Sequence, residues 1–416
     1  MKNAFCLFLC ILTPGIAAGQ TSLVEKAVRT TGEPAPTFAA SSILNASVLR
    51  STHYRISESV PVRDYRFQFQ IETNYGTFHA DGRYMLEKRL RELQAIERAA
   101  QLSGGRVIVD SAWDVARKTP KGAVTLLTDP LGALGRAPRG FERMATSLVN
   151  RMDRRAGTPT RRNLAIQLGA DPETSNPVLS HALTEIAVQQ AIGQGASKIA
   201  LGAALPGLSL LATTEDFREQ VAQRSPHEIA SDIDAELNQM KVWQPVREQF
   251  AYGNRFTSIE KLIYMSYFRE LQQIEHLDLM IHMANRADSE AAVLTRIAYV
   301  RLLHELHHQS PVASIADAGI PVAIMRDGRI FGICSVDYLH STQEVQLAAA
   351  NFRASHPTQS LQFISTGYIS PQTQRTLNAA QIQFMRADYG QPQQELRQLT
   401  SATQPLATQP SGVSNR

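Results

Sequence analysis

Cysteine usage constrains this chain most, because it decides whether covalent cross-links hold the fold. Two of its three cysteines, Cys6 and Cys10, lie in an N-terminal segment with a basic start, a short apolar run and small residues at 17–19. This layout is typical of a secretory signal peptide, and the apolar run is too short for a stable transmembrane anchor. We therefore expect cleavage near Gly19 and export to a periplasmic or extracellular compartment as a soluble protein.

Cleavage leaves Cys334 as the single thiol, so the mature chain cannot form an intrachain disulfide. Its stability must come from a packed core. The length of 416 residues and the hydrophobic content of 43% allow such a core in two or three domains. Cys334 stands in an apolar run, which favours a buried small side chain over a nucleophile.

Positive charge is concentrated between Arg136 and Arg162, where eight arginines stand against two acidic residues. Such a stretch attracts anionic surfaces or acidic partners, or it is simply the solvated face of a helix. Nucleic-acid binding would also need interleaved aromatic residues or a known module, and the sequence has neither. The sequence thus favours an anionic surface or acidic partner over a nucleic acid.

The pattern along the chain predicts an α+β fold that is predominantly helical. It has an N-terminal β-hairpin plus helix, a central helical region and a small C-terminal α+β domain. The expected boundaries are a signal peptide at 1–19, a flexible leader at 20–52, a hairpin-plus-helix unit with the Arg-rich segment at 53–162, a helical domain at 163–312, the α+β domain at 313–390 and a disordered tail at 391–416.

The hairpin-plus-helix unit is predicted from apolar residues that alternate with polar ones and are followed by apolar residues at helical spacing. Tyr65, Phe67, Phe69 and Ile71 alternate with polar residues, and a turn at 74–76 leads to a returning strand at 77–80. Beyond 82 an apolar stripe predicts a helix, and its charged face is expected to point outward.

The central region shows helix start signals at Asn176, Ser225, Thr257 or Ser258, and Ser289. An uncharged run at 199–214 is too short and interrupted to span a bilayer, so it predicts close helix packing or membrane-surface insertion. Beyond it, strands at 321–325 and 330–336 flank a turn containing Gly328. A helix at 342–353, a strand at 361–366, a helix start at Ser370 and a strand at 382–385 complete the α+β domain.

One motif carries specific chemistry. His304-Glu305-x-x-His308 lies on a predicted helix, and its spacing places both imidazoles on one face, one turn apart, where they can bind zinc while Glu305 activates water. Over these five residues the chain resembles the zincin metallopeptidases. Arg301 on the same face opposes a bound dication, and the helix is expected to stop at Ser310.

The third ligand is left open. Glu344 lies downstream on a helix, and Glu270 faces the motif if 262–283 and 288–309 form an antiparallel helical hairpin. Glu305 and His308 also form the Glu-x-x-His pair of di-iron bundles, but no second pair is present. A structural interpretation is a His-rich helix end, in which protonated imidazoles favour the negative end of the helix dipole.

These observations favour a non-enzymatic binding or interaction protein of a bacterial envelope or extracellular space. The first alternative is a zinc-dependent metallohydrolase or metallopeptidase, in which His304 and His308 bind the metal and Glu305 is the general base. The second is a protein that binds membrane surfaces through the 199–214 run and the Arg-rich stretch.

Overall fold

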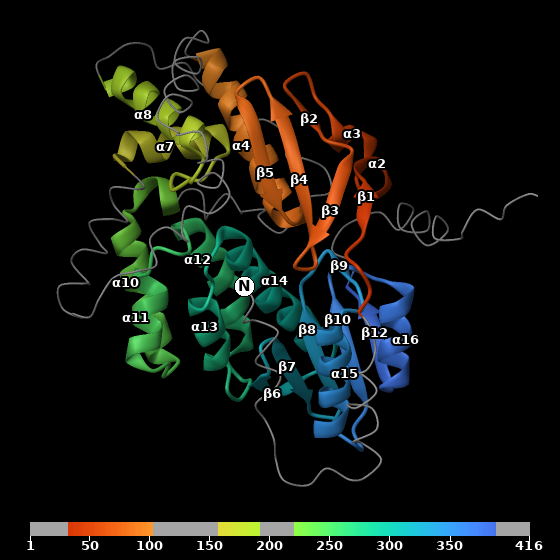
Figure 1. Ribbon diagram of the computed structural model, residues 1–416. Helices are drawn as coiled ribbons and strands as arrows, with labels where there is room; N and C mark the ends of the chain where they lie inside the picture. Colours follow the sequence, from red (N-terminus) through yellow and green to blue (C-terminus); the bar gives the residue numbers. More distant parts are fainter. Residues whose placement is uncertain (1–31, 103–156, 192–219, 388–416) are drawn as a thin grey trace, which may run out of the picture.

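The computed structural model describes residues 32–102, 157–191 and 220–387. It has the predicted α+β architecture, with an N-terminal antiparallel sheet, central helices and a C-terminal mixed sheet covered by helices (Figure 1). The expected signal peptide, most of the Arg-rich stretch, the 199–214 run and the expected tail lie outside the described residues.

The N-terminal sheet is built around β4 (Arg66–Thr73), which buries Phe67, Phe69 and Ile71 on one face as its alternation predicts. It pairs on one edge with β5 (Gly76–Asp81) and on the other with β2 (Tyr54–Ile56) and β3 (Ser59–Arg63). Gly76 closes the turn at φ 116°, in a backbone region that favours glycine. The predicted hairpin is confirmed.

Helix α4 (Arg83–Leu102) lies where the sequence predicts, but its charged face does not point outward. Glu87, Lys88, Arg89 and Glu92 are all buried. The expectation failed because α4 is covered twice: the sheet packs on one side, and α7 (Pro159–Leu168), α8 (Pro177–Ala191) and α14 (Glu290–Gln309) pack on the other.

The segment expected to be a flexible leader has regular structure from Thr37 on. Strand β1 (Thr37–Ala39) pairs with β3, and the short helices α2 (Ala40–Ile43) and α3 (Ala46–Leu49) follow. Two apolar residues anchor it: Ala40 is fully buried, and the Phe38 ring lies 4.8 Å from that of Tyr338. Sparse apolar residues suffice here because they dock on an existing core.

The predicted start signals of the central helices are confirmed. Asn176 caps the first turn of α8, Ser289 caps α14, and Ser225 and Thr257 form capping boxes. The remaining elements are α10 (Pro226–Gln239), α11 (Gln244–Tyr252), α12 (Ser258–Phe268), the 3-10 helix η4 (Arg269–Leu271) and α13 (Asp278–Asn285). The single helix expected over 262–283 is therefore two helices with an irregular link.

The end of the Arg-rich stretch falls within the described residues, and its side chains point inward. Arg161 is 5% exposed and donates to the Pro172 carbonyl and the Ser180 hydroxyl. Arg162 is 7% exposed and donates to the Gly157 carbonyl. These two arginines thus tie the α7–α8 region together and do not add to an exposed basic surface.

The C-terminal sheet has the strand order β12-β10-β8-β7-β6, with β8, β10 and β12 parallel and β6, β7 and β8 antiparallel. Its elements are β6 (Val312–Asp317), β7 (Pro321–Met325), β8 (Ile330–Cys334), β9 (Tyr338–Leu339), α15 (Gln343–Ser355), β10 (Leu361–Ser365), β11 (Tyr368–Ile369), α16 (Pro371–Ala379) and β12 (Ile382–Arg386). All were predicted except β6 and the short pair β9 and β11.

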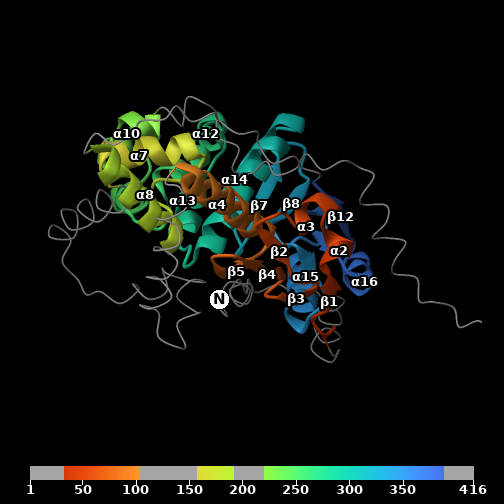
Figure 2. The ribbon, with the colours of Figure 1, turned by 90° about the horizontal axis from the view of Figure 1, so that it is seen from above.

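Helices cover this sheet on both faces. Phe352 of α15 and Leu377 of α16 pack on one face, and α14 lies against the other (Figures 1 and 2). Cys334 is 1% exposed, and burial raises the pKa of its thiol to about 12. This agrees with the interpretation of Cys334 as a small buried side chain.

Candidate metal centre

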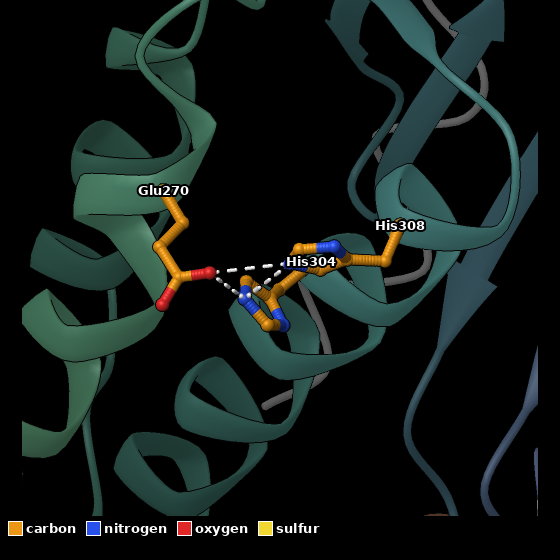
Figure 3. Close-up of side chains that lie close together, drawn as sticks. All are labelled: Glu270, His304 and His308. Atoms are coloured by element: carbon orange, nitrogen blue, oxygen red, sulfur yellow. Dashed lines mark hydrogen bonds and ion pairs between the residues drawn. The ribbon is translucent and has the colours of Figure 1, made fainter.

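The candidate site lies where the C-terminal ends of α12 and α14 meet. The two helices pack against each other in the same direction, so the 3-10 turn η4, which extends α12, comes beside the last turns of α14. Glu270 on η4 faces His304 and His308 on α14 (Figure 3). The sequence brought Glu270 to the motif only on condition that 262–283 and 288–309 pair in opposite directions. That condition does not hold for α12, but of the third-ligand candidates Glu270 lies at the motif.

The three side chains point one donor atom each toward a common position. Glu270 Oε2 lies 2.8 Å from His304 Nε2 and 3.2 Å from His308 Nε2, and the two Nε2 atoms are 3.0 Å apart. A tetrahedral zinc ion with bonds of about 2.0–2.1 Å separates its ligand atoms by about 3.3 Å. The group therefore fits zinc after opening by a few tenths of an ångström.

Hydrogen bonds alone do not satisfy this arrangement. A hydrogen bond between the two imidazole nitrogens needs a proton on one of them and a lone pair on the other. A proton used in that hydrogen bond is not free for the hydrogen bond to the Glu270 carboxylate. A cation at the common position would accept a lone pair from each of the three atoms at once. The donor set, one carboxylate and two imidazoles, is of the kind found at catalytic zinc sites.

The charge and exposure of the group also suit a metal. Hydrogen bonds from His304 and His308 lower the pKa of Glu270, so its carboxylate stays ionised. The exposed side-chain fraction is 57% for Glu270, 59% for His308 and 16% for His304, so one side of the group is open to solvent. A bound metal would have room for a further ligand on that side.

His304 lacks one support that metal-binding histidines usually have. Its Nδ1 atom is buried and has no hydrogen-bond partner among the described residues. At most metal sites the second ring nitrogen donates to a carboxylate or carbonyl, and losing that bond weakens metal binding by about 10- to 100-fold. We therefore expect a weaker affinity here than at a fully supported site.

Glu305 stands beside the group and is not one of its members. Its carboxylate accepts a 3.0 Å hydrogen bond from Arg301 Nε, one helical turn earlier. The charges of both residues act on the hydroxyl of Tyr267, whose ring lies 5.3 Å from that of His304. The pairing with Glu305 offsets part of the positive charge of Arg301, so Arg301 opposes a bound metal less than an unpaired arginine would.

The other sequence candidates lie elsewhere or have structural roles. His307 Nδ1 accepts the Val312 amide, and burial, followed by the nearby positive charges, lowers the pKa of His307, so both effects oppose protonation of this ring. Glu344 lies on α15 of the C-terminal domain, where it accepts a 3.4 Å hydrogen bond from the hydroxyl of Tyr65. Glu270, His304 and His308 form the one group of three or more possible metal ligands found in the described ranges.

The helix end itself has the predicted form. Helix α14 ends at Gln309, and the Ser310 amide closes the last turn on the Leu306 carbonyl. Tyr267 was missed by the sequence analysis, because its place beside His304 depends on the parallel alignment of α12 and α14. Only its position three residues before Glu270, on the same helical face, could have suggested it.

Comparison with protein-family models, with curated proteins and with solved structures finds no match to this chain. The function of the site must therefore be argued from its geometry.

Proposed function

We propose that this protein is an exported zinc-dependent hydrolase whose metal is held by Glu270, His304 and His308. The observation that carries the proposal is the convergence of the three donor atoms within 3.2 Å of one another on an open surface. Zinc held by three protein ligands keeps a position for water and lowers the pKa of that water to about 7.

In this proposal the protein's own residues have separate tasks. Glu270 neutralises part of the metal charge, and the two histidines fix its position on α14. Glu305 accepts the proton of the attacking water, for which it must turn from Arg301 toward the site. That pairing is partly exposed, with 37% of the Glu305 side chain accessible, so breaking it costs little, about 0.5 kcal/mol.

The other expectations from the sequence stay predictions. A non-enzymatic binding role would leave the site as a metal-dependent contact with a partner, and the proposed hydrolase differs from it in needing Glu305. For the membrane-surface alternative, no helix in the described ranges is long and apolar enough to span a bilayer.

Metal analysis of the mature protein tests the proposal most directly. After equilibration with zinc and gel filtration, we expect about one zinc per chain in the wild type. His304→Ala and Glu270→Ala should each weaken zinc binding by more than about 100-fold, because removing a ligand costs more than removing its outer support. His282→Ala on α13 is the matched control and should bind zinc as the wild type does, since His282 is outside the group.

Glu305→Gln separates catalysis from binding. This variant should keep stoichiometric zinc and lose hydrolysis of a labelled casein and of a p-nitrophenyl ester, the two general probes of peptidase and esterase activity. A typical loss on removing a general base is about 10²- to 10⁴-fold. Absence of zinc from the wild type would refute the metal site. Bound zinc without Glu305-dependent hydrolysis would refute the enzyme and leave the metal-dependent binding role.

A further inference from the structure

An apolar cavity of about 40 Å³ lies in the C-terminal domain, between α15 and the sheet that this helix covers (Figure 1). Residues of α15, α16 and the strands β8, β9, β10 and β12 contribute to its wall, and all the residues that line it are apolar. Because α14 packs on the other face of the same sheet, the sheet separates this cavity from the helix that carries His304 and His308.

The space exists because small residues stand where the helix meets the sheet. Ala348 and Ala349 form part of the wall on α15, and Gly332 forms part of it on β8. Gly332 does not have the positive φ that would require a glycine, and a Cβ atom there would lie 3.2 Å from the Phe363 ring. A glycine inside a strand often marks a place where another group comes close. Gly332 thus leaves room beside Phe363.

Phe363 indicates independently that the cavity communicates with solvent. It lies on β10, between β8 and β12, on the same face of the sheet as Leu361. Leu361 is 1% exposed, as expected beneath two helices, but Phe363 is only half-buried. Ala348, which also lines the cavity, is half-buried too. The wall therefore includes side chains that solvent can reach.

The chemistry of the wall limits what can bind. No polar atom lines the cavity, so a polar group placed inside it would lose its hydrogen bonds to water without replacement. Cavities of this kind stay dry, and their walls lack contacts that an apolar ligand would supply. One water-sized sphere needs about 10–15 Å³, so the cavity takes about three or four non-hydrogen atoms.

We propose that this cavity binds the terminal carbons of an unbranched alkyl chain, while the polar end of the ligand stays in solvent beyond Phe363 and Ala348. The ligand is a free amphiphilic molecule taken from solution. Contact with the walls replaces hydration of the chain end, and the absence of polar wall atoms selects against a polar or charged end. This proposal is independent of the metal site.

The experiment titrates the full mature chain with unbranched 1-alkanols from ethanol to 1-octanol. The readout is the ¹³C-methyl signals of Ala348 and Ala349 in alanine-labelled protein, because these methyl groups line the cavity. We expect saturable shifts of both signals. The affinity should rise about four-fold with each added methylene while the chain still enters the cavity. The rise should stop at about four carbons, where the cavity is full.

Two variants change the cavity in opposite directions. Ala349→Leu places three carbons in it and should weaken alkanol binding by more than about 10-fold, with the Ala348 methyl as the reporter. Ala354→Leu adds the same side chain to α15 away from the wall and should bind as the wild type does. Val345→Ala enlarges the cavity, so the affinity should keep rising for about one or two carbons more.

Circular dichroism shows whether each variant keeps its fold. The proposal would be overturned if neither alanine methyl signal of the wild type shifted saturably, or if folded Ala349→Leu bound alkanols as tightly as Ala354→Leu. An unchanged chain-length limit in folded Val345→Ala would also overturn it, and this test does not depend on the folding of Ala349→Leu.

Discussion

The two ends of the α12–α14 pair gather ionisable side chains in opposite ways. At the N-terminal ends the charges are buried and every carboxylate meets a cation or a donor. Lys88 Nζ lies 2.8 Å from Glu260 and 3.1 Å from Glu290, and Arg89 lies 2.9 Å from Glu290 and 2.7 Å from Glu92. At the C-terminal ends Glu270, His304 and His308 point one donor atom each toward a common position, and the side chains of Glu270 and His308 are more than half exposed.

This difference separates structure from function on physical grounds. A buried ion network tolerates desolvation only because its members neutralise one another, so its role is to fix helices in place. An exposed cluster of lone pairs contributes little to the fold, and it is poised to bind something that the chain does not supply. The same two helices thus have a rigid end and a binding end.

Removing Glu290 should produce the largest effect of those we predict. Burial acts to raise the pKa of this carboxyl, but Lys88 and Arg89 outweigh it and hold the pKa far below its usual range. Glu290→Ala leaves two buried cations with too few partners, and we expect a loss of about 3–5 kcal/mol in unfolding free energy by urea titration. Glu270→Ala, the control at the exposed end, should lose less than about 1 kcal/mol without metal.

Equal losses of unfolding free energy in Glu290→Ala and Glu270→Ala would contradict this distinction between the two ends. They would mean that the exposed group of Glu270, His304 and His308 stabilises the fold as much as the buried ion network does. Glu290→Gln provides a second check, since it keeps the shape and removes only the charge. Its loss should fall between those of the other two variants.

Zinc should stabilise the protein only by binding to Glu270, His304 and His308. At a free concentration 100 times the dissociation constant, a ligand that binds only the folded state adds about 2.7 kcal/mol. We expect a matching rise in the unfolding midpoint of the wild type in zinc and none in His304→Ala. If the His304 variant gained as much as the wild type, the metal would be binding elsewhere, such as at other surface histidines.

Asp171 should make the rigid end sensitive to pH. Burial and then the charge of Glu173 raise its pKa to about 7, although Lys88 and a 2.6 Å hydrogen bond from Thr257 oppose the rise. The unfolded pKa is about 3.9, so between these values the folded protein holds a proton that the unfolded chain releases. Stability from this group therefore grows as pH falls from about 8 toward 4.

The measurement compares unfolding free energies at pH 7.5 and pH 5.5. The wild type should gain about 1–2 kcal/mol more than Asp171→Asn over this interval, because the asparagine keeps the shape without titrating. Identical pH dependence in the two proteins would show that Asp171 is ionised throughout. The charged groups that act on Asp171 are Glu173, Lys88, Glu260 and Arg161. The Thr257 hydroxyl and the Glu173 amide are its neutral donors.

The sequence predicts the helices and strands of this fold better than it predicts which of their side chains are buried. Strand β4, the capping signals of α8, α10, α12 and α14, and the β7–β8 hairpin around Gly328 depend on residues near one another in the chain, so a local pattern specifies them. The burial of Lys88 and Arg89 is not specified by a local pattern, because their partners Glu260 and Glu290 lie about 170 to 200 residues away. A charged helix face looks the same in a sequence whether water or a partner helix covers it.

The candidate site shows the same limit. His304 and His308 are one turn apart on one helix, so their spacing alone brings them together. Glu270 could only be named as one of two alternatives, and for the wrong reason, because the sequence did not show that α12 ends at Phe268 and runs parallel to α14.

The smallest predicted effect concerns Arg301, which lies on α14 three residues before His304 and pairs with Glu305. Its ion pair with Glu305 is partly exposed, so Arg301→Gln should change the unfolding free energy by less than about 1 kcal/mol. Removing a positive charge beside a dication should tighten zinc binding by about two- to five-fold at low salt, and the gain should shrink as salt screens the interaction. Arg255→Gln, at a distance from the group, is the control and should leave zinc affinity unchanged. If Arg301→Gln weakened zinc binding instead, Arg301 would be supporting the ligands rather than opposing the metal.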